Sequence, residues 1–285
     1  MPDFDRGFKI AADSAGPSLA ELAGLHCDSW ESAEIDIQTA ERLADRVFRA
    51  KIGRERFVVY VEAYSTWKKD APWNMLAKSG LLSERERLPA VCLVFILTPK
   101  RYRPTGGTFR LELSGRPTQQ LWYHEVRLWE QEVRPEWESQ PGLMALSPLC
   151  RQKLSAKQGI VFARDAIIQQ ISDRTQRASL LTTLAIFGKL GHPEIDARKI
   201  IGSEAMRESK FFEEVEESAR VELSRKLVLE VLSLRFGSER TGEFGDAIRA
   251  LDDFVELHEL HRVAVKCRRP SEFRKALEAY SHVKS

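Results

Sequence analysis

The sequence has few cysteines and no closely spaced pair of them. The four thiols are far apart in a chain of 285 residues, and no CxxC motif occurs. Scattered cysteines of this kind are typical of a reducing compartment rather than of a disulfide framework or a zinc site. We therefore expect reduced structural cysteines and a cytoplasmic location. The four are Cys27, Cys92, Cys150 and Cys267.

Long hydrophobic runs are also missing. The longest, residues 88–97, is interrupted by Pro89 and has about half the length that a bilayer-spanning helix needs. The N-terminal residues contain no basic stretch that leads into an apolar run, so no signal peptide is visible. We expect a soluble protein without a membrane partner.

Neither sign of charge dominates. Lysine and arginine total 44 against 42 acidic residues, for a formal net charge of +2, while 43% of the residues are hydrophobic. This composition is that of a globular protein, and any nucleic-acid surface must come from local clusters. Two such clusters suit phosphate contacts, and the alternative is a solvated rim. The first is Lys68 and Lys69; the second is Lys100, Arg101, Arg103, Arg110 and Arg116, which Glu112 alone opposes between Pro99 and Gln120.

The first half of the chain has the pattern of an α/β domain. Gly16-Pro17 splits residues 4–25 into two short helices. Residues 43–48 and 56–64 resemble the two strands of a hairpin with its turn near Gly53. The second strand is apolar almost throughout, which predicts a central position in the sheet. A helix over 72–82 and a buried strand over 90–97 then indicate a crossover and parallel pairing. More exposed strands are expected over 109–113 and 122–128.

The second half has the pattern of helices. We expect them over 158–172, 176–190, 204–236, 244–266 and 271–280. The change of pattern predicts one domain over 1–150 and an all-α region over 151–285. The helix over 204–236 carries one apolar stripe, which suggests self-association. That stripe consists of Phe212, Val215, Ala219, Leu223, Leu227, Val231 and Leu234.

Common catalytic motifs are absent: no GxSxG elbow, no phosphate-binding loop and no GxGxxG is present. One carboxylate stands out instead, because Glu62 lies inside the apolar strand, where a charge is costly unless it is paired or binds a metal. A hairpin turn near Gly53 places Asp45 roughly opposite Glu62. If both side chains point the same way, they form the kind of oxygen site that Mg²⁺ prefers. The alternative is a structural ion pair of Glu62 with Arg46 or with a helix lysine.

A set of segments spread in order along the chain carries a family resemblance: 4–9, 44–48, 59–64, 71–76, 88–91, 123–130, 141–149, 206–209 and 234–237. Together they resemble the recombination-promoting nuclease (transposase-like) family of the PD-(D/E)XK nuclease superfamily. Segment 4–9 is similar to the HDxxFK start of that family, 44–48 to its first acidic strand, 59–64 to its VHVEIQ strand and 71–76 to its Pro-Arg-Arg-Met segment. The resemblance implies a restriction-endonuclease-like mixed sheet with flanking helices, followed by the all-α region.

The resemblance also implies a metal-dependent DNA endonuclease, in which Asp45 and Glu62 bind Mg²⁺ or Mn²⁺ and a metal-bound water attacks a phosphodiester. The N-terminal motif alone implies two further roles: Asp5 joins the site as another carboxylate, and Lys9 contacts phosphate. The chain departs from the family where Tyr64 replaces Gln or Lys, and it also has Phe4 for His and Asn74 for Arg.

Two functional hypotheses follow. In the first, Lys78 supplies from the helix the positive charge that Tyr64 lacks, although a solvated lysine is the simpler interpretation of Lys78. In the second, the protein is a catalytically degenerate nuclease fold that acts as a DNA-binding or self-association module through helix 204–236. The acidic pair favours the first hypothesis and Tyr64 the second.

Overall fold

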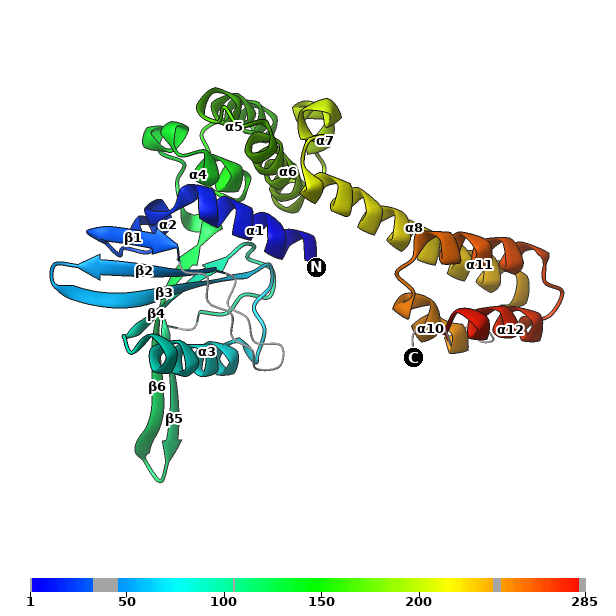
Figure 1. The fold of residues 1–285 in the computed structure, drawn as a ribbon, viewed down its shortest axis with the longest axis horizontal. Helices are drawn as coiled ribbons and strands as arrows, with labels where there is room; N and C mark the ends of the chain where they lie inside the picture. Colours follow the sequence, from blue (N-terminus) through cyan, green and yellow to red (C-terminus); the bar gives the residue numbers. More distant parts are fainter. Residues whose placement is uncertain (1, 33–45, 105, 238–241, 282–285) are drawn as a thin grey trace. The chain divides into compact units, whose positions relative to one another are not determined.

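The computed structural model describes residues 2–32, 46–104, 106–237 and 242–281. The chain divides into two compact units, Met1–Ser209 and Lys210–Ser285. The first contains a sheet and helices, and the second contains helices alone among its described residues (Figure 1). The chain is thus an α/β protein with a mostly helical C-terminal part.

The first unit is built on a six-stranded mixed sheet in the order β1-β2-β3-β4-β6-β5. β3, β4 and β6 are parallel neighbours, and the other pairs are antiparallel. The strands are β1 Ser29–Ser32, β2 Arg46–Ile52, β3 Glu55–Tyr64, β4 Ala90–Ile96, β5 Thr108–Leu113 and β6 Arg116–Arg127.

The predicted hairpin is confirmed. Gly53 adopts a φ of 57° in the turn between β2 and β3, a conformation that favours glycine. The register runs from Ile52 opposite Glu55 to Arg46 opposite Val61. β3 is an interior strand whose residues 57–62 are buried, as the apolar run predicts. Residues 43–45 of the predicted first strand lie outside the described residues.

Helices cover both faces of the sheet (Figure 1). α3, Ala71–Glu86, connects β3 to the parallel β4, and its Met75 and Leu82 join the apolar cluster on one face. It continues beyond the predicted 72–82 and ends where Arg87 takes a left-handed conformation. α1, Pro2–Ala15, lies on the other face, where the rings of Phe8 and Phe95 are 5.2 Å apart. As predicted, a second short helix follows Gly16.

The remaining helices of the first unit pack on α1 and on one another. Gly142 permits the close crossing of α1 and α4, because a Cβ there would lie 2.3 Å from the backbone nitrogen of Ala15. Since α4, α5 and α6 pack together, the change of pattern at residue 150 falls inside this compact unit. The elements are α2 Pro17–Leu22, η1 Leu128–Glu130, η2 Pro135–Ser139, α4 Pro141–Leu146, η3 Ser147–Leu149, α5 Ala156–Gln170, α6 Arg174–Gly191, α7 Ala197–Ile201 and η4 Ser203–Met206.

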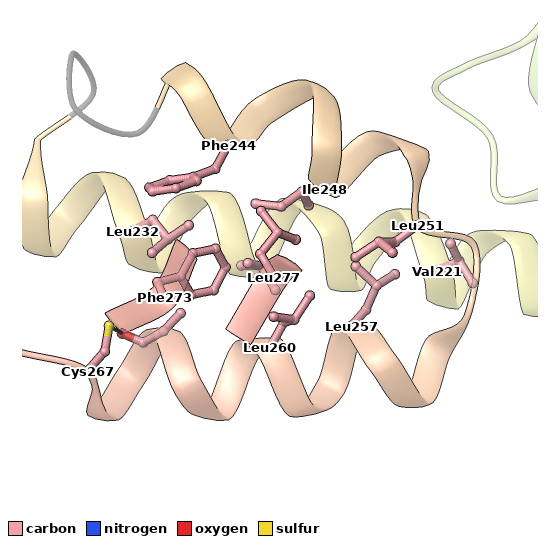
Figure 2. Close-up of a cluster of buried hydrophobic side chains, with 12 residues drawn as sticks. Val221, Leu232, Phe244, Ile248, Leu251, Leu257, Leu260, Cys267, Phe273 and Leu277 are labelled. Atoms are coloured by element: carbon pink, nitrogen blue, oxygen red, sulfur yellow. Dashed lines mark hydrogen bonds between the residues drawn. The ribbon is translucent and has the colours of Figure 1, made fainter. Parts of the chain in front are cut away.

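The second unit has a hydrophobic core of its own. Figure 2 shows Val221 and Leu232 of the long helix facing Ile248, Leu260 and Phe273 from the other helices. The elements are α8 Lys210–Phe236, η5 Gly242–Phe244, α10 Gly245–Ala250, α11 Phe254–Lys266 and α12 Pro270–Ser281.

Two helices in this region differ from the predicted ones, the first in its start and the second in its continuity. The expected helix 204–236 begins only at Lys210, because residues 203–206 form a separate 3-10 turn. The expected helix 244–266 is two helices: Leu251 is extended, and the Asp253 side chain accepts hydrogen bonds from the N–H groups of Val255 and Glu256, which starts α11.

The members of the predicted apolar stripe of α8 are not all buried on one side of the helix. Phe212 and Val215 are buried, whereas Leu223, Leu227 and Leu234 are exposed. Val221, Val228 and Leu232 face the core instead. A second set of apolar residues therefore lies outside this core.

Sequence reasoning also missed or shortened parts of the sheet. β1 is short and was not expected. β6 begins at Arg116, six residues before the expected strand, and it includes Pro117. The pairing register of β5 and β6 shifts beside this proline, between Leu111 and Glu112. A strand tolerates proline at such an irregularity. The turn-like sequence around residues 114–117 conceals this start of β6.

Candidate functional site

A buried ion pair joins the sheet to α3. The whole residue Glu62 on β3 is 3% exposed, and Lys78 on α3 is 7% exposed. The Lys78 Nζ donates to Glu62 Oε1 at 2.7 Å and to Oε2 at 2.8 Å. A charge at such depth is stable only with a partner of this quality, so the two residues form one structural and electrostatic unit.

Local periodicity explains why these side chains meet. Val58, Tyr60 and Glu62 alternate along β3 and point to the face that α3 covers. On the helix, Lys78 follows Met75 by three residues and precedes Leu82 by four, so it shares their core-facing stripe. The Tyr60 hydroxyl, which donates to the Met75 carbonyl at 2.8 Å, fixes strand and helix one turn away from the pair.

Tyr64 completes this end of β3. Its hydroxyl lies 3.4 Å from Glu62 Oε2 as a long hydrogen-bond donor, and its ring contacts Trp67 edge-on at 5.7 Å. The structure thus brings together three of the predicted catalytic residues: Glu62, Tyr64 and Lys78. Asp45, the fourth, lies outside the described residues; the last described pair of the hairpin is Arg46 with Val61.

The simpler interpretation of Lys78, a solvated side chain, is wrong. Its position in the core-facing stripe of α3 buries it, and Glu62 neutralises its charge. Of the two ion-pair partners expected for Glu62, the helix lysine is observed. Arg46 donates from Nε to Asp13 of α1 at 2.5 Å.

A second carboxylate lies on the same face of the sheet, and sequence reasoning did not select it. Glu62 is in register with Val94 of β4, which is in register with Glu125 of β6, so the two acids occupy one row across three parallel strands. Two strand spacings separate their backbones, or about 10 Å. The alternation of Tyr123, Glu125 and Arg127 was the available signal.

Glu125 is held by hydrogen bonds of its own. The Tyr102 hydroxyl donates to Oε1, and Arg127 Nε lies 3.4 Å from the same oxygen. Burial, and then the hydrogen bond to Glu125, raise the pKa of Tyr102 above the ordinary tyrosine value of 10.0. The hydroxyl therefore remains a neutral donor to the carboxylate throughout the physiological range.

Two basic loops leave the sheet beside these acids. Lys68 and Lys69 are exposed in the loop after β3. The loop after β4 exposes Lys100, Arg101 and Arg103. The loops are tied together, because the Leu97 N–H donates to the Tyr64 carbonyl at 2.9 Å and the Thr98 hydroxyl to the Ser65 carbonyl at 2.7 Å. Ligands of α/β sheets bind at such carboxyl ends of parallel strands.

The structure does not place the other residues predicted to contact phosphate or metal at the cluster formed by Glu62, Tyr64, Lys78 and Glu125. Lys9 is half-buried on α1, which covers the opposite face of the sheet from α3. The side chain of Asp5 lies outside the described residues. Arg110 and Arg116 belong to the β5–β6 hairpin, where Arg110 pairs with Glu112 at 2.7 Å.

The donor chemistry of the cluster fits a hard divalent cation. Mg²⁺ takes oxygen ligands and is usually held by one or two carboxylates plus waters. A carboxylate offers about four acceptor positions, so the contacts from Lys78 do not by themselves exhaust Glu62. Within the described part of the chain, no group of three or more His, Cys, Asp or Glu residues is arranged to hold a metal.

Comparison of the chain with protein-family models, with curated proteins and with solved structures found no match. Among the described helices, none has the length and apolar character needed to cross a membrane.

Proposed function

We propose that this protein is a metal-dependent endonuclease that hydrolyses phosphodiester bonds in DNA. The observation that carries the proposal is the buried contact of Lys78 with both oxygens of Glu62, at the carboxyl end of a central parallel strand. It supplies an acid and a fixed positive charge side by side, and basic loops flank it. The proposal includes the finer fold assignment, a PD-(D/E)XK-type sheet.

The order of elements supports that assignment. The resemblance implies a hairpin with an acidic residue on each strand, followed by a helix and a further strand. The chain has β2, β3, α3 and β4 in that order, with Glu62 on β3. Asp45 directly precedes β2, whose first residue, Arg46, pairs with the residue before Glu62. We propose Asp45 as the second acid.

Each residue then has a defined task. Glu62 and Asp45 would hold Mg²⁺ or Mn²⁺, which when bound lowers the pKa of water and stabilises negative charge on phosphate. Lys78 orients the Glu62 carboxylate and provides the positive charge that Tyr64 lacks. Tyr64 donates a hydrogen bond beside it. The exposed lysines and arginines of the two loops contact the DNA backbone without reading its sequence.

A second candidate function is a DNA-binding or self-association module without catalysis. The closed geometry of the pair favours it, because Lys78 contacts both Glu62 oxygens and a tyrosine occupies the position of the expected Gln or Lys. In this candidate the pair only fixes α3 on the sheet, as buried ion pairs do in many folds.

Cleavage of supercoiled plasmid separates the two candidates. The native chain is incubated with Mg²⁺ or Mn²⁺, beside EDTA and beside the variants Glu62→Gln and Asp45→Ala. Glu112→Gln is the matched control, because this acid is exposed on β5 and pairs with Arg110. We expect metal-dependent nicking by the native chain and the control and a loss of at least about 100-fold in both site variants.

Tryptophan fluorescence monitors folding of the variants, since all six tryptophans lie in the first unit. Nicking that survives EDTA, or that persists in a folded Glu62→Gln variant, contradicts the enzyme. Absence of both nicking and Mn²⁺ binding in the folded native chain favours the non-catalytic module.

A further inference from the structure

A heptad-spaced seam runs along the side of α8 that faces away from the core of the second unit. We define the α8 seam as Glu216, Arg220, Leu223, Leu227, Glu230 and Leu234. Successive members are four and three residues apart in alternation, which is the spacing of a coiled-coil contact line. At about 100° per residue, the seam lies opposite Val221, Val228 and Leu232, the residues that α8 gives to its core.

The leucines of the seam are exposed to an unusual degree. Leu223 is 59% exposed, Leu227 is 41% and Leu234 is 80%. Leu223 and Leu227 are neighbours along the seam, and Leu234 follows after Glu230. Single exposed apolar residues need no explanation, but three exposed leucines on one side of a helix mark an interaction surface. The hydrophobic core in Figure 2 uses the other side of this helix, so α8 has a second apolar face.

The charges of α8 are divided between its halves. Residues 210–222 contain five glutamates against two basic residues, whereas residues 223–236 contain three basic residues against one glutamate. Two copies of α8 in antiparallel orientation place the acidic half of each beside the basic half of the other. Parallel copies place like charges together. The charge pattern therefore selects both the partner and its direction.

We propose that a second copy of this chain binds along the α8 seam in antiparallel orientation. Leu223 of each copy then packs on Leu227 of the other, which forms two leucine layers at the centre. In the same register Arg220 lies opposite Glu230 of the second copy, twice over.

The charged side chains of the α8 seam are available for this pairing. Glu230 makes no ion pair with any other residue that the structure describes. The ion pairs of Arg220 within its own helix are long: its Nη2 lies 4.0 Å from Glu216 Oε2 and its Nη1 lies 3.8 Å from Glu217 Oε2. The leucine layers supply affinity, and the two charge pairs set the direction, since exposed ion pairs contribute more to specificity than to affinity.

Sedimentation equilibrium of the full chain tests the proposal. We expect a dimer of the 32.6 kDa chain at about 100 μM and a monomer for Leu227→Asp. Glu230→Arg places two arginines together in each pair and should weaken association about 100-fold. Adding Arg220→Glu to it restores opposite charges and should restore the dimer. Glu278→Arg, an exposed acid on α12, is the matched control and should leave the dimer intact.

Circular dichroism confirms that each variant keeps its helices, which is expected because the substituted side chains are exposed. A native chain that stays monomeric at this concentration overturns the proposal. A dimer that Leu227→Asp does not weaken also overturns it. Failure of the charge exchange to restore association contradicts the antiparallel register, because two parallel copies keep like charges opposed in the exchanged variant as well.

Discussion

The face of the sheet that α3 covers, here called the α3 face, and the core of the second unit are both well buried, but they bury different kinds of side chain. Among the described residues of the second unit no charged side chain is buried, and Ser224 is its one buried polar residue. The α3 face encloses Glu62 and Lys78. Replacing such a pair with apolar side chains is often neutral or stabilising, so packing alone does not account for it. The second unit is thus organised for packing alone, whereas the α3 face buries a charged pair for which the proposed catalytic role supplies a reason.

The largest expected effect comes from breaking the buried pair from one side. Lys78→Met removes the positive charge that neutralises the buried Glu62 carboxylate and should lower the free energy of unfolding by about 3–5 kcal/mol. Urea unfolding followed by tryptophan fluorescence measures this in the first unit. The double variant Glu62→Leu/Lys78→Met should recover most of the loss. A Lys78→Met variant as stable as the native chain would show that the buried charges of Glu62 and Lys78 do not depend on each other.

Deleting apolar atoms in the second unit should have a comparable but purely local effect. Leu260 is fully buried on α11, and Leu260→Ala should cost about 2–5 kcal/mol. Hydrogen exchange of peptides from α8, α11 and α12 should accelerate accordingly. The exposed control Val255→Ala on the same helix should leave their exchange unchanged. Equal acceleration in both variants would mean that the cluster in Figure 2 is not the stabilising core.

A smaller effect is expected at the second acid of the α3 face. Tyr102→Phe removes the donor to the partly buried Glu125 and should lower the free energy of unfolding by about 1–2 kcal/mol at pH 7. The contribution depends on pH with a defined sign. Because the folded-state pKa of Tyr102 is raised, its contribution is fully present below pH 10 and is lost as the pH rises from 10 through the folded-state pKa.

Urea unfolding of the native and Tyr102→Phe chains across that range isolates this residue, since Tyr60 and the cysteines remain in both. The difference between the two chains should shrink above pH 10. A difference that grows with pH would show that the hydroxyl is not the protonated donor in the folded state.

The smallest effect is expected for an exposed ion pair of the second unit. Arg262 lies 3.0 Å from Glu259 on α11, three residues away, and both side chains are largely exposed. Arg262→Ala should change the free energy of unfolding by less than about 0.5 kcal/mol. Chemical unfolding followed by far-ultraviolet circular dichroism provides the measurement. A loss as large as that of Lys78→Met would erase the contrast between buried and exposed charge.

Much of the sheet could be predicted from the sequence, because its strands carry local signals. The apolar run before Glu62, the turn at Gly53 and the helix between two buried strands determine the β2–β3 hairpin and the parallel β4. The short β1 and the proline-containing start of β6 carry weak signals and were missed or shortened. In the helical part, the break at Leu251 depends on the cap at Asp253, which a continuous apolar pattern conceals.

The candidate site was predictable only in part. Glu62 stands out because a carboxylate in an apolar strand needs a partner, but the partner depends on which face α3 covers. Lys78 is one of many helix lysines until its alignment with Met75 and Leu82 shows that it faces the sheet. For Glu125, strand alternation signals which residues share its face, but its place in one row with Glu62 depends on the register of three strands, which a sequence does not contain.

The most direct test of the central claim compares stability and plasmid nicking in the double variant Glu62→Leu/Lys78→Met. If the pair exists for phosphodiester hydrolysis, the variant should unfold within about 1 kcal/mol of the native chain and should nick plasmid no faster than the native chain in EDTA. A folded double variant that nicks plasmid at the native rate in Mg²⁺ would contradict the account.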